Sequence, residues 1–306
     1  MLLLLLIILC GIAISWYQNY TFKKTTYYKI THNSFISTRC DLGRNGEYLT
    51  YKYLQSYENK GGKFLFNCYL PKDNGETTEI DVILINEDGV FCFESKNYSG
   101  WIFGDEKAKN WTQTLPKGKG RSHKEYFLNP IIQNKVHIKW LKKQIGENIP
   151  VHSVIVFSER CTLKKVHIES PDIYVINRNK ILSTVREIGN RQNQKLTTQT
   201  INSLYDSLYP YTQVSGVVKE QHIDNIQNNK VDKCNNVTAN NFRPEKRKKE
   251  DGKVQNQLNE IKVDSSNLCP KCGSELVLRI AKRGDNSGKQ FYGCSSYPKC
   301  KFIRNL

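Results

Sequence analysis

Two apolar runs joined by a short turn constrain the fold of this chain more than any other feature of its sequence. They cover residues 79–85 and 90–96, and the residues between them are Asn86-Glu87-Asp88-Gly89. Apolar runs on either side of an Asp-Gly pair are the usual signal of a tight hairpin. The sequence therefore predicts a β-hairpin over these residues.

The hairpin gathers charged side chains. With Asp88-Gly89 as the two-residue loop, Asp81 lies opposite Lys96; with Glu87-Asp88 as the loop, it lies opposite Glu94. In both registers Asp81, Glu94 and Lys96 share one face, because strand side chains alternate every two residues. Carboxylates this close repel unless a divalent cation such as Mg²⁺ lies between them, and a lysine beside it can orient or deprotonate a water. This is hydrolytic machinery, although a hairpin whose charges merely face water satisfies the same short motif.

The neighbouring segments extend the pattern. Residues 43–49 open a helix that runs to about Gln55, with Glu47 in its first turn, where the helix dipole favours a carboxylate. Residues 63–70 predict a strand. Further along the chain come a Trp-x-Gln motif at Trp111 and an Asn-Pro-x-x-Gln motif that begins at Asn129.

This succession resembles the nuclease-related domain, NERD, of the PD-(D/E)xK nuclease superfamily over residues 42–157. The resemblance rests on GxxGE, EID, ExK, WxQ and NPxxQ occurring together and in order. It implies an α/β fold with a restriction-endonuclease-like mixed sheet flanked by helices. It also implies a metal-dependent phosphodiesterase whose site residues are Glu47, Asp81 and Glu94 as magnesium ligands, Lys96 beside the attacking water, and Gln133 on the following helix.

One position departs from the family pattern. Some relatives have a tyrosine four residues after the glutamine, where this chain has His137. Gln133 and His137 share a helix face at positions i and i+4, so they equally fit a polar pair that faces solvent.

The rest of the domain alternates strands and helices. The helix from about Pro130 to Ile145 follows a cap at Asn129. We expect its apolar face to pack on the sheet, with Ile131, Ile132, Val136, Trp140, Leu141 and Ile145. The remaining predictions are strands over 151–157 and 173–176 and helices over 178–188 and 196–208, which together give a domain over 40–209.

Four cysteines near the far end have the spacing of a structural zinc site: Cys269, Cys272, Cys294 and Cys300. Two tight knuckles about twenty residues apart can bring four thiolates into one tetrahedron, with disulfides as the alternative. The pattern over 268–303 resembles the four-cysteine zinc finger at the C-terminus of bacterial type IA DNA topoisomerases. That resemblance implies a zinc-ribbon-like module, over 267–304, that binds single-stranded DNA. Basic and aromatic residues alternate there and suit phosphate contacts and base stacking.

Residues 210–266 join the two modules. They are rich in Asn, Gln, Lys and Asp, with little apolar periodicity. Such a segment buries too little surface to offset its ordering entropy, so we expect a flexible polar linker.

The first residues are almost wholly apolar up to Tyr17, and Lys23 and Lys24 follow. A helix over 1–20 approaches the thickness of a membrane core, so we expect a transmembrane anchor, with a cleaved signal or an interfacial segment as alternatives. The positive charges after it predict a single-pass protein of the cell membrane whose main domains lie on the cytoplasmic side.

A formal net charge of +17 favours a polyanionic partner. We therefore expect a membrane-anchored, DNA-processing protein, a magnesium-dependent nuclease with a zinc finger for single-stranded DNA. The competing interpretation is a non-catalytic DNA-binding or membrane-tethering protein.

Overall fold

The structure is a computed structural model that describes residues 1–118, 120–226, 269–271, 276–280, 290–294, 300 and 302–305. The chain divides into two compact units, Met1–Phe242 and Arg243–Leu306. Cys272 and most of the predicted linker lie outside the described residues.

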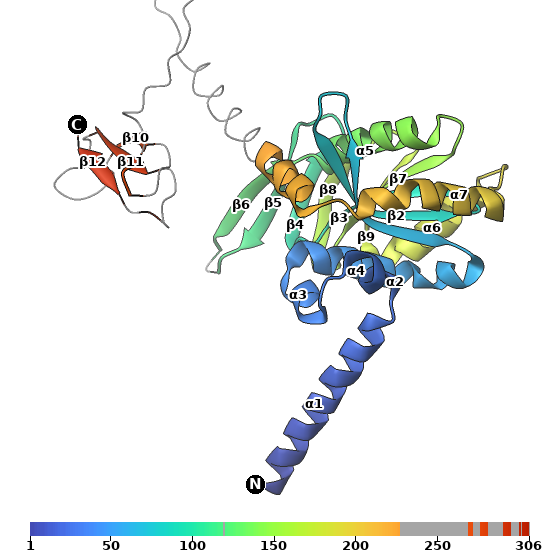
Figure 1. Cartoon of the computed structure of the whole chain (residues 1–306), viewed down its shortest axis with the longest axis horizontal. Helices are drawn as coiled ribbons and strands as arrows, with labels where there is room; N and C mark the ends of the chain where they lie inside the picture. The colour runs from blue at the N-terminus through green and yellow to red at the C-terminus, as the bar shows by residue number, and fades with distance from the viewer. Residues whose placement is uncertain are drawn as a thin grey trace, which may run out of the picture. The chain divides into compact units, whose positions relative to one another are not determined.

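The first unit mixes helices and strands (Figure 1). Its helices, with short 3₁₀ turns marked η, are α1 (Leu2–Lys23), α2 (Thr26–Thr31), α3 (Phe35–Cys40), α4 (Leu42–Leu54), η1 (Gln55–Lys60), α5 (Pro130–Ile145), η2 (Arg178–Lys180), α6 (Ile181–Asn190), α7 (Thr198–Leu208) and η3 (Tyr209–Thr212). Its strands are β1 (Lys63–Pro71), β2 (Thr77–Asn86), β3 (Gly89–Lys96), β4 (Gly100–Asp105), β5 (Asn110–Pro116), β6 (Ser122–Leu128), β7 (Val151–Phe157), β8 (Cys161–His167) and β9 (Ile173–Asn177).

A five-stranded mixed sheet forms the centre of this unit, in the order β1-β2-β3-β7-β9. The first three strands are antiparallel, and β7 and β9 continue the sheet in parallel with β3. The middle strand β3 is buried on both faces over Gly89–Glu94, which explains its nearly continuous apolar sequence. The predicted α/β domain with a mixed sheet is confirmed.

Helices cover both faces of this sheet. On one face, Tyr51 of α4 and Val185 of α6 pack with Phe91 and Phe93. On the other face, Leu141 of α5 and helix α7 pack on the opposite side of the same strands (Figure 1). The domain is therefore a three-layer arrangement in which β2 and β3 lie at the centre.

A second sheet has the order β6-β5-β4-β8. Trp111 of β5 stacks on Phe157 of β7, with ring centroids 6.0 Å apart, and fixes this sheet to the first. The sequence did not predict these strands because they are short and mostly half-exposed; β6 has no fully buried residue. Their apolar side chains pack between elements that are distant in the sequence, and local periodicity does not reveal such contacts.

The N-terminal helix α1 contains a stretch, Leu4–Lys23, that is long and apolar enough to cross a membrane by length and composition. Its exposed side chains include Trp16 and Tyr17. Its last turn behaves differently: Phe22 is 1% exposed and packs edge-on against Tyr27 and Tyr48 in the domain core.

The second unit contains β10 (Leu276–Ile280), β11 (Gln290–Cys294) and β12 (Ile303–Asn305). They form an antiparallel sheet in that order. Buried cysteines pack with Leu276 beside this sheet.

The start of the predicted linker is folded. Residues 216–226 are helical, and Thr212 and His222 are buried. His222 packs edge-on against Tyr69 of β1, with ring centroids 5.4 Å apart. The polar composition of this segment did not predict the helix, because its packing depends on contacts with β1 and β2 rather than on an apolar face of its own.

Gly104 gives a direct test of the packing between the sheets. A Cβ atom at this position would lie 2.2 Å from the Trp111 ring, and Trp111 is 1% exposed. We expect Gly104→Ala to lower the free energy of unfolding by about 1–3 kcal/mol, because overpacking displaces the indole. Thermal or denaturant unfolding measures this. Gly216→Ala, where a Cβ meets nothing within 4 Å, is the control and should be near neutral.

Candidate functional site

The hairpin register decides between the two loops that the sequence allowed. Val82 pairs with Phe93, and Asn86 pairs with Gly89. Glu87-Asp88 is therefore the loop, and the same register places Asp81 opposite Glu94. The backbone N–H of Ser95 donates to Asp81 Oδ2 at 2.8 Å, which fixes the aspartate beside the end of β3.

Helix α5 supplies the partners of Glu94 and Lys96. Lys96 Nζ donates to Glu94 Oε1 at 2.5 Å and to Gln133 Oε1 at 3.1 Å. His137 Nε2 lies 3.0 Å from Glu94 Oε2, and His137 Nδ1 lies 2.7 Å from the hydroxyl oxygen of Thr78. Glu94 is 1% exposed, so this network is enclosed between the hairpin and the helix.

The polar pair on α5 does not face solvent, because His137 is 4% exposed. Three of the expected apolar residues, Ile131, Trp140 and Leu141, are buried, whereas Ile132 and Val136 are 37% and 39% exposed. The buried face is centred on Leu141 and carries polar groups, Asn134 and His137 among them. The apolar pattern therefore predicted only part of this face, because buried polar residues resemble solvent-facing ones in a sequence.

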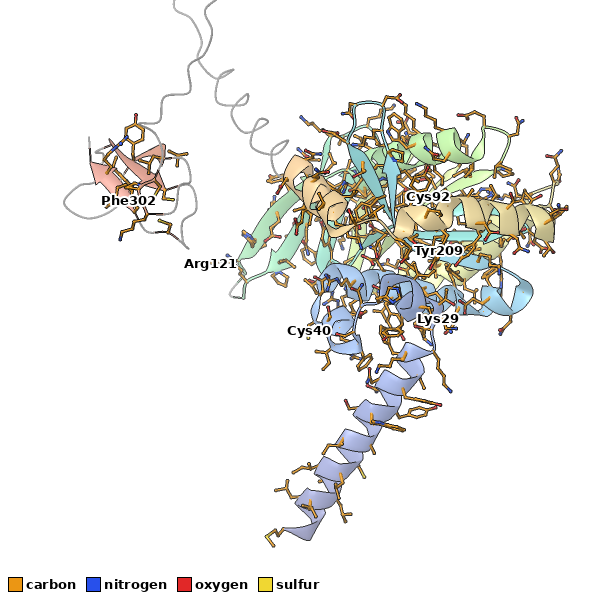
Figure 2. The ribbon with its side chains drawn as sticks, in the orientation of Figure 1. Lys29, Cys40, Cys92, Arg121, Tyr209 and Phe302 are labelled. Carbon is orange, nitrogen blue, oxygen red and sulfur yellow. The ribbon has the colours of Figure 1, made fainter. Side chains whose placement is uncertain are left out.

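Asn134 is the residue that sequence reasoning missed most completely. It is fully buried, and its amide donates to the carbonyl of Cys92 at 3.1 Å and to Ser153 Oγ at 2.9 Å. Figure 2 shows Cys92 within the domain. Asn134 thus joins α5 to β3 and β7 and places Gln133 and His137 over the hairpin.

Glu47 approaches from the other side of the sheet. It lies in the second turn of α4, not the first, because the helix begins at Leu42 after the cap at Asp41. Side-chain hydrogen bonds take the place of the expected helix dipole: Tyr27 Oη donates to Glu47 Oε2 at 3.3 Å, and Asn67 Nδ2 donates to the same oxygen at 3.2 Å.

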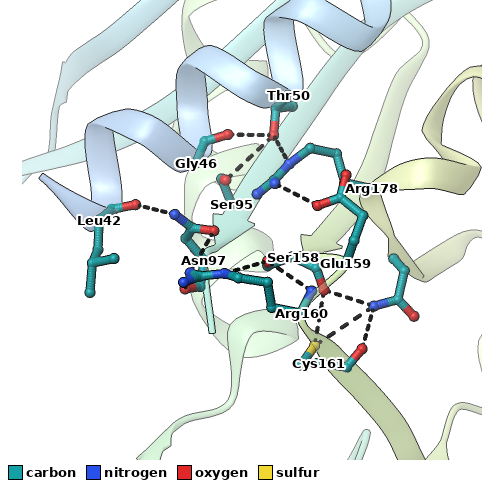
Figure 3. A network of polar contacts seen from close by, with 11 residues as sticks. Leu42, Gly46, Thr50, Ser95, Asn97, Ser158, Glu159, Arg160, Cys161 and Arg178 are labelled. Atoms are coloured by element: carbon teal, nitrogen blue, oxygen red, sulfur yellow. Dashed lines mark hydrogen bonds and ion pairs between the residues drawn. The ribbon is translucent and has the colours of Figure 1, made fainter. Parts of the chain in front are cut away.

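The approach of α4 depends on a glycine and a polar network (Figure 3). A Cβ atom at Gly46 would lie 3.0 Å from both Asn97 Cβ and Ser95 Oγ, so the helix could not come as near with a larger residue. Asn97 Nδ2 donates to the carbonyl of Leu42 at 2.8 Å, and Thr50 Oγ1 lies 3.4 Å from Ser95 Oγ. The network ties the helix that carries Glu47 to the strand that carries Glu94.

Burial and charge divide the titrating groups into two kinds. Burial, and then the negative charge of Glu79, raises the pKa of Glu47 to about 7. Burial, and then the charges of Glu94 and Glu47, raises the pKa of Asp81 well above its usual range. These two carboxyl groups therefore hold a proton more readily than exposed ones do, and a bound cation would favour their charged forms.

The Glu94–Lys96 pair behaves differently. Burial alone would raise the pKa of Glu94, but the charge of Lys96 and the bond from His137 outweigh it, and the pKa falls. Burial alone would lower the pKa of Lys96, but the carboxylates of Glu94 and Asp81 outweigh it, and the pKa rises. Lys96 therefore stays protonated, which suits orienting a water or an anion rather than removing a proton.

The residues fit a hard divalent cation by their chemistry. Magnesium takes oxygen ligands, often from one or two carboxylates. Here Asp81 and Glu94 lie near the Lys96 ammonium group, and the charge of Glu47 acts on Asp81. Within the described residues, hydrogen bonds to Asp81 and Glu47 each use one carboxylate oxygen and leave the other free. In the same described part, however, the oxygens of Glu47, Asp81 and Glu94 do not all lie within 4.8 Å of one another. Shared ligation requires a side chain to turn.

The second unit has a cysteine site. Ligand atoms of Cys269, Cys294 and Cys300 all lie within 4.8 Å of one another, and the sulfurs of Cys269 and Cys300 are 3.7 Å apart. A disulfide requires about 2.05 Å, whereas two thiolates about 2.3 Å from one tetrahedral zinc lie about 3.8 Å apart. The geometry supports structural zinc. The fourth predicted ligand, Cys272, lies outside the described residues.

Aromatic and basic residues pair on the small sheet. Tyr292 of β11 lies opposite Arg304 of β12, and the guanidinium carbon is 5.1 Å from the ring centroid. Phe291 lies opposite Arg279 in the register with β10. This alternation agrees with the nucleic-acid contacts that the sequence predicted.

Comparisons with known proteins agree with this division. The family model of the nuclease-related domain matches residues 42–158. The model of the topoisomerase DNA-binding C4 zinc finger matches residues 266–306. No solved structure matches.

Relatives match either module. An uncharacterised protein of Bacillus anthracis is 32% identical over 186 residues, which are 61% of this chain and 84% of that protein. DNA topoisomerase 1 of Helicobacter pylori strain J99 is 35% identical over 28% of this chain, but the match spans only 11% of the topoisomerase. The uncharacterised protein YrdD of Escherichia coli is 48% identical over 14% of this chain and 22% of its own length. The chain belongs to the nuclease-related domain, or NERD, family and joins that domain to a topoisomerase-type C4 zinc ribbon.

Proposed function

We propose that this protein is a metal-dependent nuclease that hydrolyses phosphodiester bonds in DNA and is held at the cell membrane by α1, with its main domains on the cytoplasmic side. The observation that carries the proposal is the gathering of Asp81, Glu94, Lys96 and Gln133 at one end of the hairpin, with Glu47 adjacent. Membership of the nuclease-related domain family supports it.

Each residue has a role that follows from its surroundings. Glu47, Asp81 and Glu94 would hold Mg²⁺, which when bound supplies an activated water and neutralises charge on the phosphate. Lys96, protonated beside Glu94, orients the attacking water or the phosphate. Gln133 accepts a hydrogen bond from Lys96 at 3.1 Å and holds the ammonium group in place. His137 holds Glu94 from its other oxygen.

The zinc module has the second role. We propose that Cys269, Cys272, Cys294 and Cys300 bind one structural zinc and that the module captures single-stranded DNA. The topoisomerase-type family match supports DNA binding, and the exposed Arg304 beside the Tyr292 ring supplies a cation and a stacking surface.

A second candidate function has an observation of its own. One oxygen of Glu94 accepts a hydrogen bond from Lys96, and the other lies within hydrogen-bond distance of His137. Both oxygens of Glu94 therefore have protein partners without an ion. A domain in this state binds DNA or tethers it to a membrane without cleaving it. Turnover distinguishes the two candidates.

The catalytic assignment predicts a loss of turnover that exceeds any loss of stability. Lys96→Met should also lower stability, because it leaves the buried Glu94 charge without its partner. We expect Asp81→Asn and Lys96→Met each to lower the magnesium-dependent cleavage rate at least about 100-fold, because each removes a group that acts on the reacting atoms. Asp73→Asn and Lys52→Met change the same residue types at exposed positions and are the matched controls. Gel assays on single- and double-stranded DNA, with circular dichroism for the fold, measure both effects. Unchanged turnover in both variants would refute the nuclease assignment. DNA binding without turnover in the wild-type protein would favour the second candidate function.

The zinc assignment predicts one zinc per chain and a division of labour. We expect Cys269→Ser to abolish zinc binding and to weaken binding of single-stranded DNA, with a flatter salt dependence, because the phosphate contacts of the module are lost. Cleavage at saturating DNA should not change. Cys40→Ser, at an exposed cysteine outside the site, is the control. Full zinc content in Cys269→Ser, measured by atomic absorption, would contradict the site.

A further inference from the structure

The outer face of the β6-β5-β4-β8 sheet carries aromatic side chains that the proposed catalytic site does not use. Ile102 and Trp111 point from this sheet into the core, so their neighbours along the strands project from the opposite face. Trp101 and Tyr126 project there and are 52% and 74% exposed. Phe103 lies on the same face and is partly exposed. Large exposed rings on one sheet face are a sign of a binding surface.

The register arranges these side chains in two rows. One row contains Tyr126, Thr112 and Phe103, and the adjacent row contains Lys124, Thr114 and Trp101. Trp101 and Phe103 are two residues apart on one strand, and their Cα atoms are therefore about 7 Å apart. The side chains between the rings, Thr112 and Thr114, are small.

Cations border the rings. Lys164 Nζ lies 5.8 Å from the centroid of the Trp101 ring, at a position where the pairing of β8 with β4 shifts. Lys165 lies opposite Phe103. Arg121 is at the tip of the β5–β6 hairpin (Figure 2).

Acidic groups on this face are few. Thr114 is 6% exposed, and its hydroxyl oxygen has no hydrogen-bond partner. In the register of these described strands, the one carboxylate on the outer face is Asp105, at the far end of β4. The face is therefore complementary in charge to a polyanion.

We propose that this outer face binds single-stranded nucleic acid, with bases stacked on Trp101 and Tyr126 and phosphates held by Lys124, Lys164 and Lys165. Stacking on exposed aromatic rings needs unpaired bases, whose faces a duplex hides, and cations along the rings follow the backbone. This site lies in the nuclease-related domain and is separate from the zinc module. It goes beyond the proposed function and does not require cleavage.

The outer face of this sheet lies close in sequence to the proposed catalytic strand. Strand β4 begins four residues after Lys96, and Arg160, between β7 and β8, donates to the carbonyl of Asn97 at 2.8 Å. The chain thus runs directly from the proposed catalytic strand β3 into β4, which carries Trp101. The substrate class that follows is DNA with an unpaired stretch.

The test is binding of a fluorescent oligothymidylate to the full-length, detergent-solubilised protein in magnesium-free buffer. We expect Trp101→Ala to weaken affinity roughly tenfold, the scale of one lost base stack, both in the otherwise wild-type chain and in the Cys269→Ser background. Trp101→Phe should retain most of the affinity. Lys124→Ala should reduce the salt slope by about 0.7, as for one phosphate contact on a single strand. Tryptophan fluorescence should be quenched by the oligonucleotide, and this quenching should be absent in Trp101→Phe.

Trp16→Ala is the matched control, because Trp16 is also exposed but lies on α1; it should bind as the wild type does. Unchanged affinity in Trp101→Ala would overturn the proposal. So would an equal loss for Trp101→Phe, which removes stacking as the cause, or an equal loss for a duplex probe. A change in oligomeric state without a change in affinity would assign the face to contact between copies and also overturn it. Because magnesium is absent, failure of the proposed nuclease leaves this result unaffected.

Discussion

The buried ion pair between Lys96 and Glu94 is the interaction on which the candidate site depends, because it joins the end of the hairpin to helix α5. Removing two charges from water is costly, and such a pair is stable only where further hydrogen bonds satisfy it. Gln133 and His137 supply these bonds from α5, and Asn134 fixes α5 to the sheet. An apolar pair of similar volume would often be as stable. We therefore infer that the pair is kept for the chemistry of its charges.

The sequence predicted those parts of the structure whose signal is local. The hairpin follows from two apolar runs and a turn, and the zinc site follows from paired cysteines, because a few neighbouring residues determine each. The loop of the hairpin stayed open between two registers, since alternation places Asp81 and Glu94 on one face in both. Only the pairing of Val82 with Phe93 selects one.

The parts that the sequence did not predict depend on contacts between distant residues. In the sequence His137 resembles a surface residue, and only the structure places Glu94 and Thr78 against it. His222 belongs to a polar stretch, yet it is buried beside Tyr69 and lies 3.0 Å from the Thr77 hydroxyl oxygen. Glu47 was correctly placed on a helix but one turn too early, because the start of α4 is set by the Asp41 cap. Buried polar residues carry no apolar pattern, and periodicity misses them.

The burial of Phe22 has a consequence for how the protein can be divided. Helix α1 runs directly into the domain, because Phe22 in its last turn packs in the aromatic cluster of Tyr27 and Tyr48. Tyr27 in turn donates to Glu47. A soluble fragment cut just after α1 would lose the core side chain of Phe22 and leave a void near a proposed metal ligand. The safest cut lies within the helix, before its last turn, where solubility and an intact core can both be kept.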